Sequence, residues 1–428
     1  MNRMIGIPVL LILTLWMNAA PCFGGLPTTQ PEKVGLSSER LIRIDDYVQS
    51  VIDEGRIAGA VVLVARRGKV AYLKPFGWMD IENERPMEED ALFRIASMTK
   101  PITCTVAMTF YEEGRFLLND PVSRYIPEFE NPDVLVVPES GQAAPETYAT
   151  IPGQHDILVR HLLNHTSGIS YGRGPLEPFY REAGMTLGGR LRPEMKTTGD
   201  MVRVLAGLPI LHEPGERFTY GYSHDVVGYL VEVVSGVRMD EAYRERLFQP
   251  LGMKDTDFLL SKKDVQRVVS MYRRGEDGHL EKVPMGLPSS DRAQEMAMFS
   301  GGGGLFSTIS DYARFCQMIL NGGELDGVRV LSRKTVELMT ANSLGEKYAP
   351  FRFVSGDKYG YGFYIRTERG IFDELESLGT LGGGGAHKTR YWIDPEEQMI
   401  CIIMMQLRGG NWRIHHAFRN LAYQAIID

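Results

Sequence analysis

The chain has 428 residues, of which 43% are hydrophobic and 24% charged, and its formal net charge is −7. This balance is typical of a globular protein, and the dispersed lysines and arginines favour neither nucleic acid nor an anionic membrane as a partner. The length exceeds one ordinary domain and is sufficient for a large core without disulfide bonds or metals.

The first 24 residues have the layout of a signal peptide. Arg3 precedes an apolar run over residues 5–16, and small residues follow at positions 19, 20 and 24. The run is short for a membrane span, so we expect cleavage near residues 22–25 and a secreted or periplasmic protein. An uncleaved anchor is the alternative, and we expect no second membrane segment.

Three cysteines lie further along the chain, at Cys104, Cys316 and Cys401. Each stands in an apolar run, and their spacing pairs none of them. This pattern predicts buried free thiols and argues against a disulfide framework or a zinc site.

The predicted elements change in character along the chain. Residues 36–55 have the pattern of an amphipathic helix capped by Ser37 or Ser38, and two β-rich runs follow around Arg67-Gly68, a hairpin signal. A short strand then leads into a buried helix. The middle of the chain is helix-like and rich in loops, and strands return beyond residue 300 before a closing helix.

This order predicts two lobes. We expect an α/β lobe built from residues 33–119 and 291–428, interrupted by a helical lobe over residues 120–290. A cleft between the two lobes is the expected place for a binding or catalytic site.

The run FRIASMTKPIT places Ser97 and Lys100 three residues apart where the buried helix begins. At this spacing the two side chains share a helix face. A serine is a weak nucleophile without an adjacent base, and a lysine can serve as that base when burial lowers its pKa. The backbone N–H groups at the helix start can stabilise an oxyanion. A capped helix with a surface lysine is the structural alternative.

A competing serine lies in GISYG, residues 168–172, which fits the G-x-S-x-G elbow of α/β-hydrolases. That elbow needs a strand before the serine and a helix after it, and the flanking sequence favours neither. Ser170, with His165 or His212, nevertheless remains an alternative nucleophile. A loop with a helix cap at Gly168 is the structural interpretation.

The segment EPGERFTYGYSHDVVG places Tyr220 at the end of a short extended run, just before a predicted helix. A phenol at such a junction could exchange protons with a serine and a lysine. Tyr222 is a rival for this role, and a core tyrosine is the structural alternative.

Four glycines open the segment LGGGGAHKTRYWIDP, where the backbone could approach a ligand closely and offer an N–H group to an oxyanion. A flexible entry into a strand is the alternative. A second tetraglycine, Gly301–Gly304, also fits such an entry.

Taken in this order, the motifs resemble those of the serine β-lactamase-like hydrolases: class C β-lactamases, D-alanyl-D-alanine carboxypeptidases and especially the family VIII carboxylesterases. The resemblance covers about residues 33–425 and includes YEEGRFLLNDPVSRYIPEF, VRHLLNHTSGI and GGGGLFSTISDYARF. It implies an α/β (α+β) fold of the β-lactamase/transpeptidase type, with an antiparallel sheet flanked by helices and an inserted helical lobe.

The resemblance also implies roles for individual residues. Ser97 would be the acylated nucleophile and Lys100 its base, and Tyr220 would share proton transfer with Lys100. The family's third motif would fall at Gly383 to Gly385. The backbone N–H groups of Ser97 and Ala386 would then form the oxyanion hole.

The chain departs from the β-lactamase pattern at two positions. Tyr222 stands where β-lactamases carry Asn, and Gly383 stands where they carry Lys and many of the esterases carry Trp or His. Loss of this cation removes a partner for the β-lactam carboxylate. His387, Lys388 or Arg390 could compensate, although strand alternation sends them to different faces.

The sequence therefore predicts a serine hydrolase that uses neither metal nor organic cofactor and acts on a small ester or amide. A carboxylesterase on small esters is the first expectation. A D,D-peptidase or β-lactamase is the second, and a non-catalytic peptide-binding relative is an alternative of another class.

Overall fold

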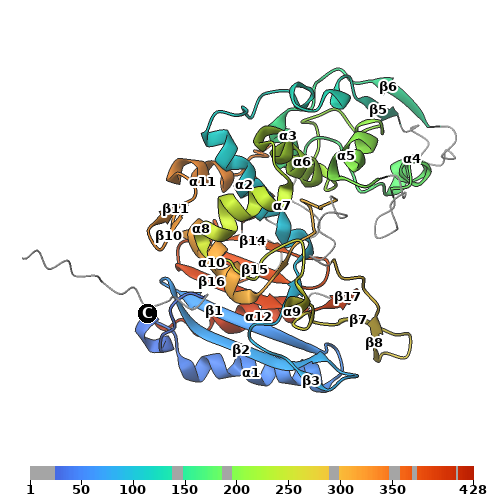
Figure 1. Ribbon diagram of the computed structural model, residues 1–428. Coiled ribbons are helices and arrows are strands. Elements are labelled where there is room, and N and C mark those ends of the chain that lie inside the picture. Colours follow the sequence, from blue (N-terminus) through green and yellow to red (C-terminus); the bar gives the residue numbers. More distant parts are fainter. Residues whose placement is uncertain are drawn as a thin grey trace, which may run out of the picture.

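The structure is a computed structural model (Figure 1). It describes residues 25–136, 148–185, 195–288, 298–346, 357–368, 374–410 and 413–428. The predicted signal segment, residues 1–24, lies outside the described residues.

An antiparallel sheet forms the base of the molecule. Within the described residues it has eight strands in the order β12-β13-β14-β15-β16-β1-β2-β3, so segments from both ends of the chain meet at its centre. Its strands are β1 (Gly59–Arg66), β2 (Lys69–Asp80), β3 (Arg85–Pro86), β12 (Asp357–Tyr359), β13 (Tyr364–Arg366), β14 (Leu381–Gly384), β15 (Arg390–Asp394) and β16 (Met399–Met404).

The hairpin predicted at Arg67-Gly68 is confirmed. Both residues have positive φ angles, 53° and 76°, and they join β1 directly to β2. Such a two-residue turn matches the right-handed twist of the paired strands. Every residue of β1 is buried, because its alternate side chains enter two different cores.

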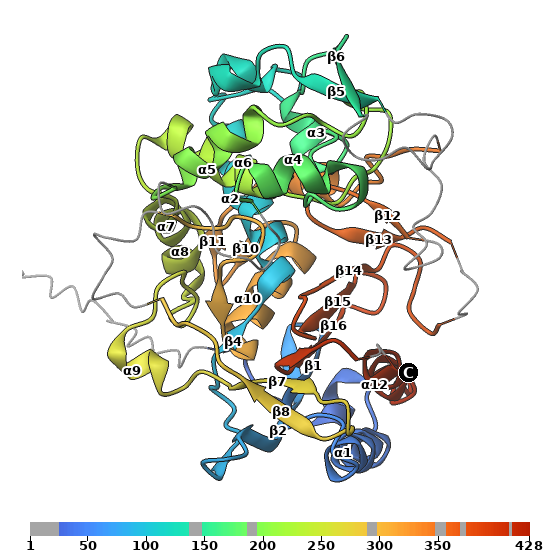
Figure 2. The same ribbon diagram turned by 90° about the vertical axis from the view of Figure 1, so that its right-hand side faces the viewer.

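Helices cover both faces of the sheet. On one face, α1 (Ser38–Asp53) packs beside α12 (Arg413–Tyr423), and Figure 2 shows the two side by side. The predicted cap of α1 is confirmed at Ser37, whose Oγ accepts the backbone N–H of Arg40 at 3.2 Å. On the other face lie α10 (Ile309–Leu320) and the longer, buried α2 (Thr99–Glu112).

A second group of elements lies above the sheet at the far end of α2 (Figure 1). In it, α6 (Ser223–Ser235) packs against α2 and forms its centre. Along the chain between α2 and residue 270, the described helices and strands other than α6 and the short 3₁₀ turns are β5 (Asp133–Val136), β6 (Ala149–Pro152), α3 (Val159–Leu163), α4 (Glu177–Glu182), α5 (Thr198–Ala206), α7 (Met239–Tyr243), a π-helical turn (Arg244–Phe248), α8 (Gln249–Leu251) and α9 (Lys262–Val265).

The segment predicted as a helical lobe, residues 120–290, also contains two strands that were not predicted from the sequence. β7 (Met271–Arg274) and β8 (Leu280–Val283) form a small sheet with β17 (Leu407–Arg408), beside the last strands of the chain. The segment up to residue 290 therefore does not belong wholly to the helical lobe. The remaining short elements are β4 (Phe93–Arg94), β9 (Phe306–Ser307), β10 (Glu324–Leu325), β11 (Val328–Arg329) and α11 (Arg333–Met339).

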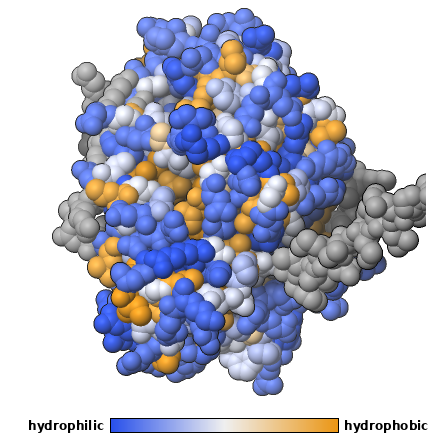
Figure 3. All heavy atoms as spheres, turned by 90° about the vertical axis from the view of Figure 1, so that its left-hand side faces the viewer, coloured by the Kyte–Doolittle hydropathy of each residue, from blue (hydrophilic) through white to orange (hydrophobic). Residues whose placement is uncertain are grey.

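The molecular surface is mainly hydrophilic on the face seen in Figure 3, with apolar groups in separate small patches. Among the described residues, no helix combines the length and the apolar character needed to cross a bilayer. Cys104, Cys316 and Cys401 are buried free thiols, as predicted. Burial raises the pKa of each thiol, so all three are unreactive.

Candidate active site

Ser97 lies in a short 3₁₀ turn, Ala96–Met98, that joins β4 to α2. The backbone N–H of Ile95 donates to the carbonyl of Leu305 at 3.1 Å, which ties the turn to the neighbouring strand. Ala96 has a φ of 44°, a left-handed conformation that is uncommon for a residue with a side chain. Ser97 is partly exposed, whereas its neighbours are buried, so this turn presents its hydroxyl outward.

Lys100 lies one turn further along and is 1% exposed. Its Nζ atom lies 3.3 Å from Ser97 Oγ, 3.0 Å from the Tyr171 hydroxyl and 2.7 Å from the carbonyl oxygen of Gly302. These three acceptors match the three N–H groups of an ammonium ion. The alternative of a surface lysine is therefore wrong.

Tyr220 lies directly before α6 and meets the same two side chains. Its hydroxyl hydrogen-bonds with Ser97, and Lys100 Nζ lies 4.6 Å from the centre of its ring. Burial raises the pKa of Tyr220, and the hydrogen bond to Ser97 acts in the opposite direction. The structure thus gathers Ser97, Lys100 and Tyr220 into one cluster that can exchange protons.

Tyr171 is the residue of this cluster that sequence reasoning missed. Its ring lies 5.8 Å from that of Tyr220 and 4.7 Å from that of Tyr222, in both cases edge to face. Tyr222 therefore contacts the cluster through Tyr171, and no hydrogen bond joins it to Ser97 or Lys100. Burial raises the pKa of Tyr171, while the charge on Lys100 lowers it.

Ser170 does not have the surroundings of a nucleophile elbow. The helix α3 precedes it, and a 3₁₀ turn, Gly174–Leu176, is the next regular element after it. Its Oγ accepts the backbone N–H of Gly172 at 2.9 Å, a local loop contact. His212 uses its ring nitrogens on Glu213 and Thr219. The GISYG motif thus supplies a tyrosine to the site and no catalytic serine.

The predicted third motif lies at the end of β14, alongside the turn that carries Ser97. A Cβ atom placed on Gly385 would stand 2.4 Å from the carbonyl oxygen of Ile95, so the two backbones approach closely. Thr389 Oγ1 also donates to that carbonyl, at 3.3 Å. Ala386 follows and is exposed. Glycine is required at 385, because any side chain would collide with the nucleophile turn.

Gly383 has no room for the cation that β-lactamases carry there. A Cβ atom would lie 2.8 Å from Cε1 of the buried Tyr391 ring. Lys388 turns away, with Nζ donating to the carbonyl of Gly410 at 3.1 Å. Arg390 differs, because its Nη1 lies 3.5 Å from the position of a Cβ on Gly384, beside the glycine strand.

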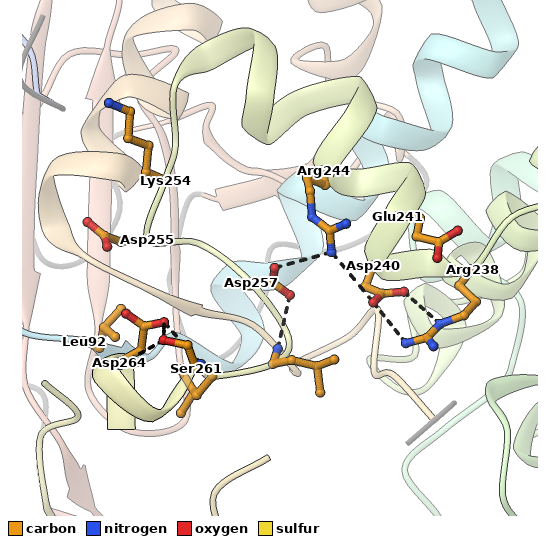
Figure 4. Close-up of a pocket in the computed structure, with 12 residues that line it drawn as sticks. Leu92, Arg238, Asp240, Glu241, Arg244, Lys254, Asp255, Asp257, Ser261 and Asp264 are labelled. Atoms are coloured by element: carbon orange, nitrogen blue, oxygen red, sulfur yellow. Dashed lines mark hydrogen bonds and ion pairs between the residues drawn. The ribbon is translucent and has the colours of Figure 1, made fainter. Parts of the chain in front are cut away.

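A charged hollow of about 380 Å³ lies elsewhere, over α7 and α9 (Figure 4). Arg244 lies 3.9 Å from Asp240 and 3.7 Å from Asp257, while Arg238 lies 3.0 Å from Asp240. These groups mainly satisfy one another, and none of the candidate catalytic residues lines the hollow. Within the described part of the chain, no three histidine, cysteine or acidic side chains gather as a metal site would require.

Similarities to known proteins extend over most of the chain. The family model described as Beta-lactamase matches residues 44–425. Protein Rv1367c of Mycobacterium tuberculosis is 35% identical over 371 residues, which cover 84% of this chain and 88% of that protein. Esterase EstB of Burkholderia gladioli is 27% identical over an alignment that covers 82% of this chain and 86% of that protein. Among solved structures, "EstCE1, a hydrolase with promiscuous acyltransferase activity" has a TM-score of 0.74 at 27% identity, over 90% of this chain and 99% of that one.

Proposed function

Because this chain belongs to the β-lactamase family and is a serine hydrolase of that family, we propose that it is a carboxylesterase that acts through Ser97. The observation that carries the proposal is the contact of Lys100 Nζ and the Tyr220 hydroxyl with the same serine oxygen. Because the relatives are enzymes of this family, the non-catalytic peptide-binding alternative is not supported.

The proposed reaction is acyl transfer in two steps. Lys100, assisted by Tyr220, accepts the proton of Ser97 as its oxygen attacks the carbonyl carbon of a small ester. The negative charge on the carbonyl oxygen is stabilised by the backbone N–H groups of Ser97 and Ala386. The tetrahedral intermediate collapses, and the proton returns to the departing alcohol. Water then attacks the acyl-enzyme by the same route and releases the acid.

Two features of the site favour an ester over a β-lactam or a peptide. Gly383 cannot carry the lysine that would meet a substrate carboxylate, because Tyr391 fills the space. Tyr222 places a phenol where β-lactamases have an amide. A β-lactamase or D,D-peptidase is the second candidate, and the nearness of Arg390 to Gly384 favours it, because a guanidinium can bind a carboxylate.

Initial rates on p-nitrophenyl butyrate and nitrocefin separate these candidates. We expect wild-type protein to hydrolyse the ester with little turnover of nitrocefin. Ser97→Ala should lose ester hydrolysis by about 10³-fold or more. Ser170→Ala is the matched control and should keep it. Activity that survives in Ser97→Ala and disappears in Ser170→Ala would refute the mechanism, and efficient nitrocefin turnover would favour the second candidate.

Adding a small alcohol to the ester reaction tests whether water is the natural acceptor of the acyl group. The relative EstCE1 is described as a hydrolase with acyltransferase activity. If this chain shares that property, added alcohol should divert part of the acyl group from acid to a new ester without changing the rate of acylation. A product that stays wholly acid would leave hydrolysis as the only reaction.

We also propose that residues 1–24 direct export of the enzyme. The support is the basic, apolar and small-residue order of that segment. Expression in a Gram-negative host should yield periplasmic protein whose mass corresponds to cleavage near residues 22–25. Full-length protein in the cytoplasm would contradict this.

A further inference from the structure

The tetraglycine Gly301–Gly304 has a definite place beside the catalytic helix, although its sequence suggested only a flexible strand entry. The carbonyl of Gly301 accepts a hydrogen bond from Thr103 Oγ1 at 2.6 Å. The carbonyl of Gly302 accepts the bond from Lys100 Nζ already described. Two successive carbonyls of this run thus hold two residues on one face of α2.

Asp225, in the first turn of α6, holds the same run from its other side. It is 2% exposed, and its Oδ1 accepts hydrogen bonds from Ser300 Oγ at 2.6 Å and from the backbone N–H of Gly302 at 3.2 Å. Gly302 is therefore bonded through its N–H to a buried acid and through its carbonyl to a buried lysine. Two hydrogen bonds, one on each side of the Gly302 backbone, therefore connect Asp225 to Lys100.

We propose that Asp225 is a positioning residue of the proposed serine hydrolase: through Gly302 it fixes Lys100 against Ser97 and balances its charge. The inference rests on the proposed function, since it assigns a task within the same site. A buried ammonium without a compensating charge is costly, and a buried carboxylate nearby reduces that cost.

A side chain at position 302 would displace the Asp225 carboxylate from this arrangement. A Cβ atom there would lie 2.5 Å from Asp225 Oδ2, closer than real contacts allow. At the neighbouring Gly303 the nearest atom to an added Cβ is a backbone atom of Ala96 at 3.7 Å, an ordinary contact. The two glycines therefore provide a matched pair for testing the role of the run.

The charge of Asp225 should be visible in the pH dependence of the reaction. Burial raises the pKa of Asp225, while the hydrogen bond from Ser300 and the charge on Lys100 oppose this shift and favour the carboxylate. Asp225 also raises the pKa of Tyr220. The titratable side chains that face Lys100 from the packed elements are Cys104, His165, Tyr171, Tyr220, His224 and Asp225.

Removing the negative charge makes loss of a proton from the cluster easier, whichever of Lys100 and Tyr220 is the base. We therefore expect Asp225→Asn to move the acid limb of the reaction to lower pH, by on the order of one pH unit. The size and one oxygen of the side chain are kept, so the hydrogen bonds to Gly302 and Ser300 can persist.

The test is the rate at which a fluorophosphonate labels Ser97, followed by intact mass between pH 5 and 9. This probe needs no knowledge of the natural substrate. The control is Asp311→Asn, because Asp311 is equally buried and also accepts one backbone N–H and one hydroxyl, from Asp255 and Thr256. Asp311→Asn should leave the acid limb unchanged.

The outcomes distinguish the inference from the proposed function. A labelled wild type with the same acid limb in Asp225→Asn overturns the inference alone. A wild type that is not labelled at Ser97 overturns both. If Asp225→Asn does not fold, Gly302→Ala should label at least about tenfold more slowly than wild type, while Gly303→Ala should change the rate less than about threefold. Equal rates for the two glycine variants would also overturn the inference.

Discussion

Replacing His224 with leucine should make the protein less sensitive to acid. His224 and His165 are fully buried, and their ring centres lie 4.3 Å apart, behind the ring of Tyr220. Within the described part of the chain, none of their four ring nitrogens has a hydrogen-bond partner. Burial lowers the pKa of both imidazoles, and the charge on Lys100 adds to this effect.

The size of the effect follows from proton linkage. In the unfolded chain a histidine has a pKa of about 6.5, whereas in the fold these two remain neutral well below that value. Stability is therefore complete above pH 6.5 and is lost as the pH falls, by about 1.4 kcal/mol per pH unit for each group. Between pH 7 and pH 5 each histidine should lower the free energy of unfolding by about 2 kcal/mol.

Other buried groups act in the opposite direction. Burial raises the pKa of Glu232 and of Asp311 to about 7, so these carboxyls take up protons in the fold and gain stability on acidification. The measurement must therefore compare two proteins. Urea unfolding followed by circular dichroism at pH 7 and pH 5 should give a stability loss about 2 kcal/mol smaller in His224→Leu than in wild type.

The control is His279→Leu, because His279 is exposed in the turn between β7 and β8. This variant should keep the wild-type loss of stability between the two pH values. If His224→Leu also keeps it, the buried imidazole must already carry a proton in the fold, and the reasoning from burial is refuted.

Two further predictions concern the site itself. Tyr171→Phe keeps the ring but removes the hydroxyl 3.0 Å from Lys100 Nζ, so kcat on p-nitrophenyl butyrate should fall about 10- to 100-fold with little change in KM; an unchanged kcat would exclude a role for this contact. Gly383→Ala should lower the free energy of unfolding by about 1–3 kcal/mol, because its Cβ would overlap the Tyr391 ring. Gly382→Ala, whose Cβ meets no atom closer than 3.3 Å, should cost less in the same denaturation assay, and equal losses would contradict the packing argument.

Local signals predicted much of the fold. The turn at Arg67-Gly68 and the cap at Ser37 each depend on neighbouring residues, so the sequence contains the information that fixes them. The spacing of Ser97 and Lys100 is likewise local, since one helical turn determines their contact. Their partner Tyr220 needed the family resemblance, because only the folded chain brings it to the helix.

Long-range contacts explain what the sequence did not reveal. Tyr171 follows Ser170 in a motif that resembles the nucleophile elbow of α/β-hydrolases. Nothing near Tyr171 in the sequence indicates its contact with Lys100. The role of Gly302 depends on Asp225 and Lys100, which lie far from it along the chain. The strands β7 and β8 were not predicted, and their partner β17 comes more than a hundred residues later in the chain.

The pairing of β1 with β16 has a consequence for how the chain folds as it is made. Val61 of β1 lies opposite Met404 of β16, so the first and the last strands of this sheet along the chain are paired with each other. Such non-local pairing slows folding, because distant segments must meet before any contact rewards them. During synthesis the edge of β1 that pairs with β16 stays open until almost the whole chain has emerged, and an unpaired strand edge of this kind makes a nascent chain prone to aggregation.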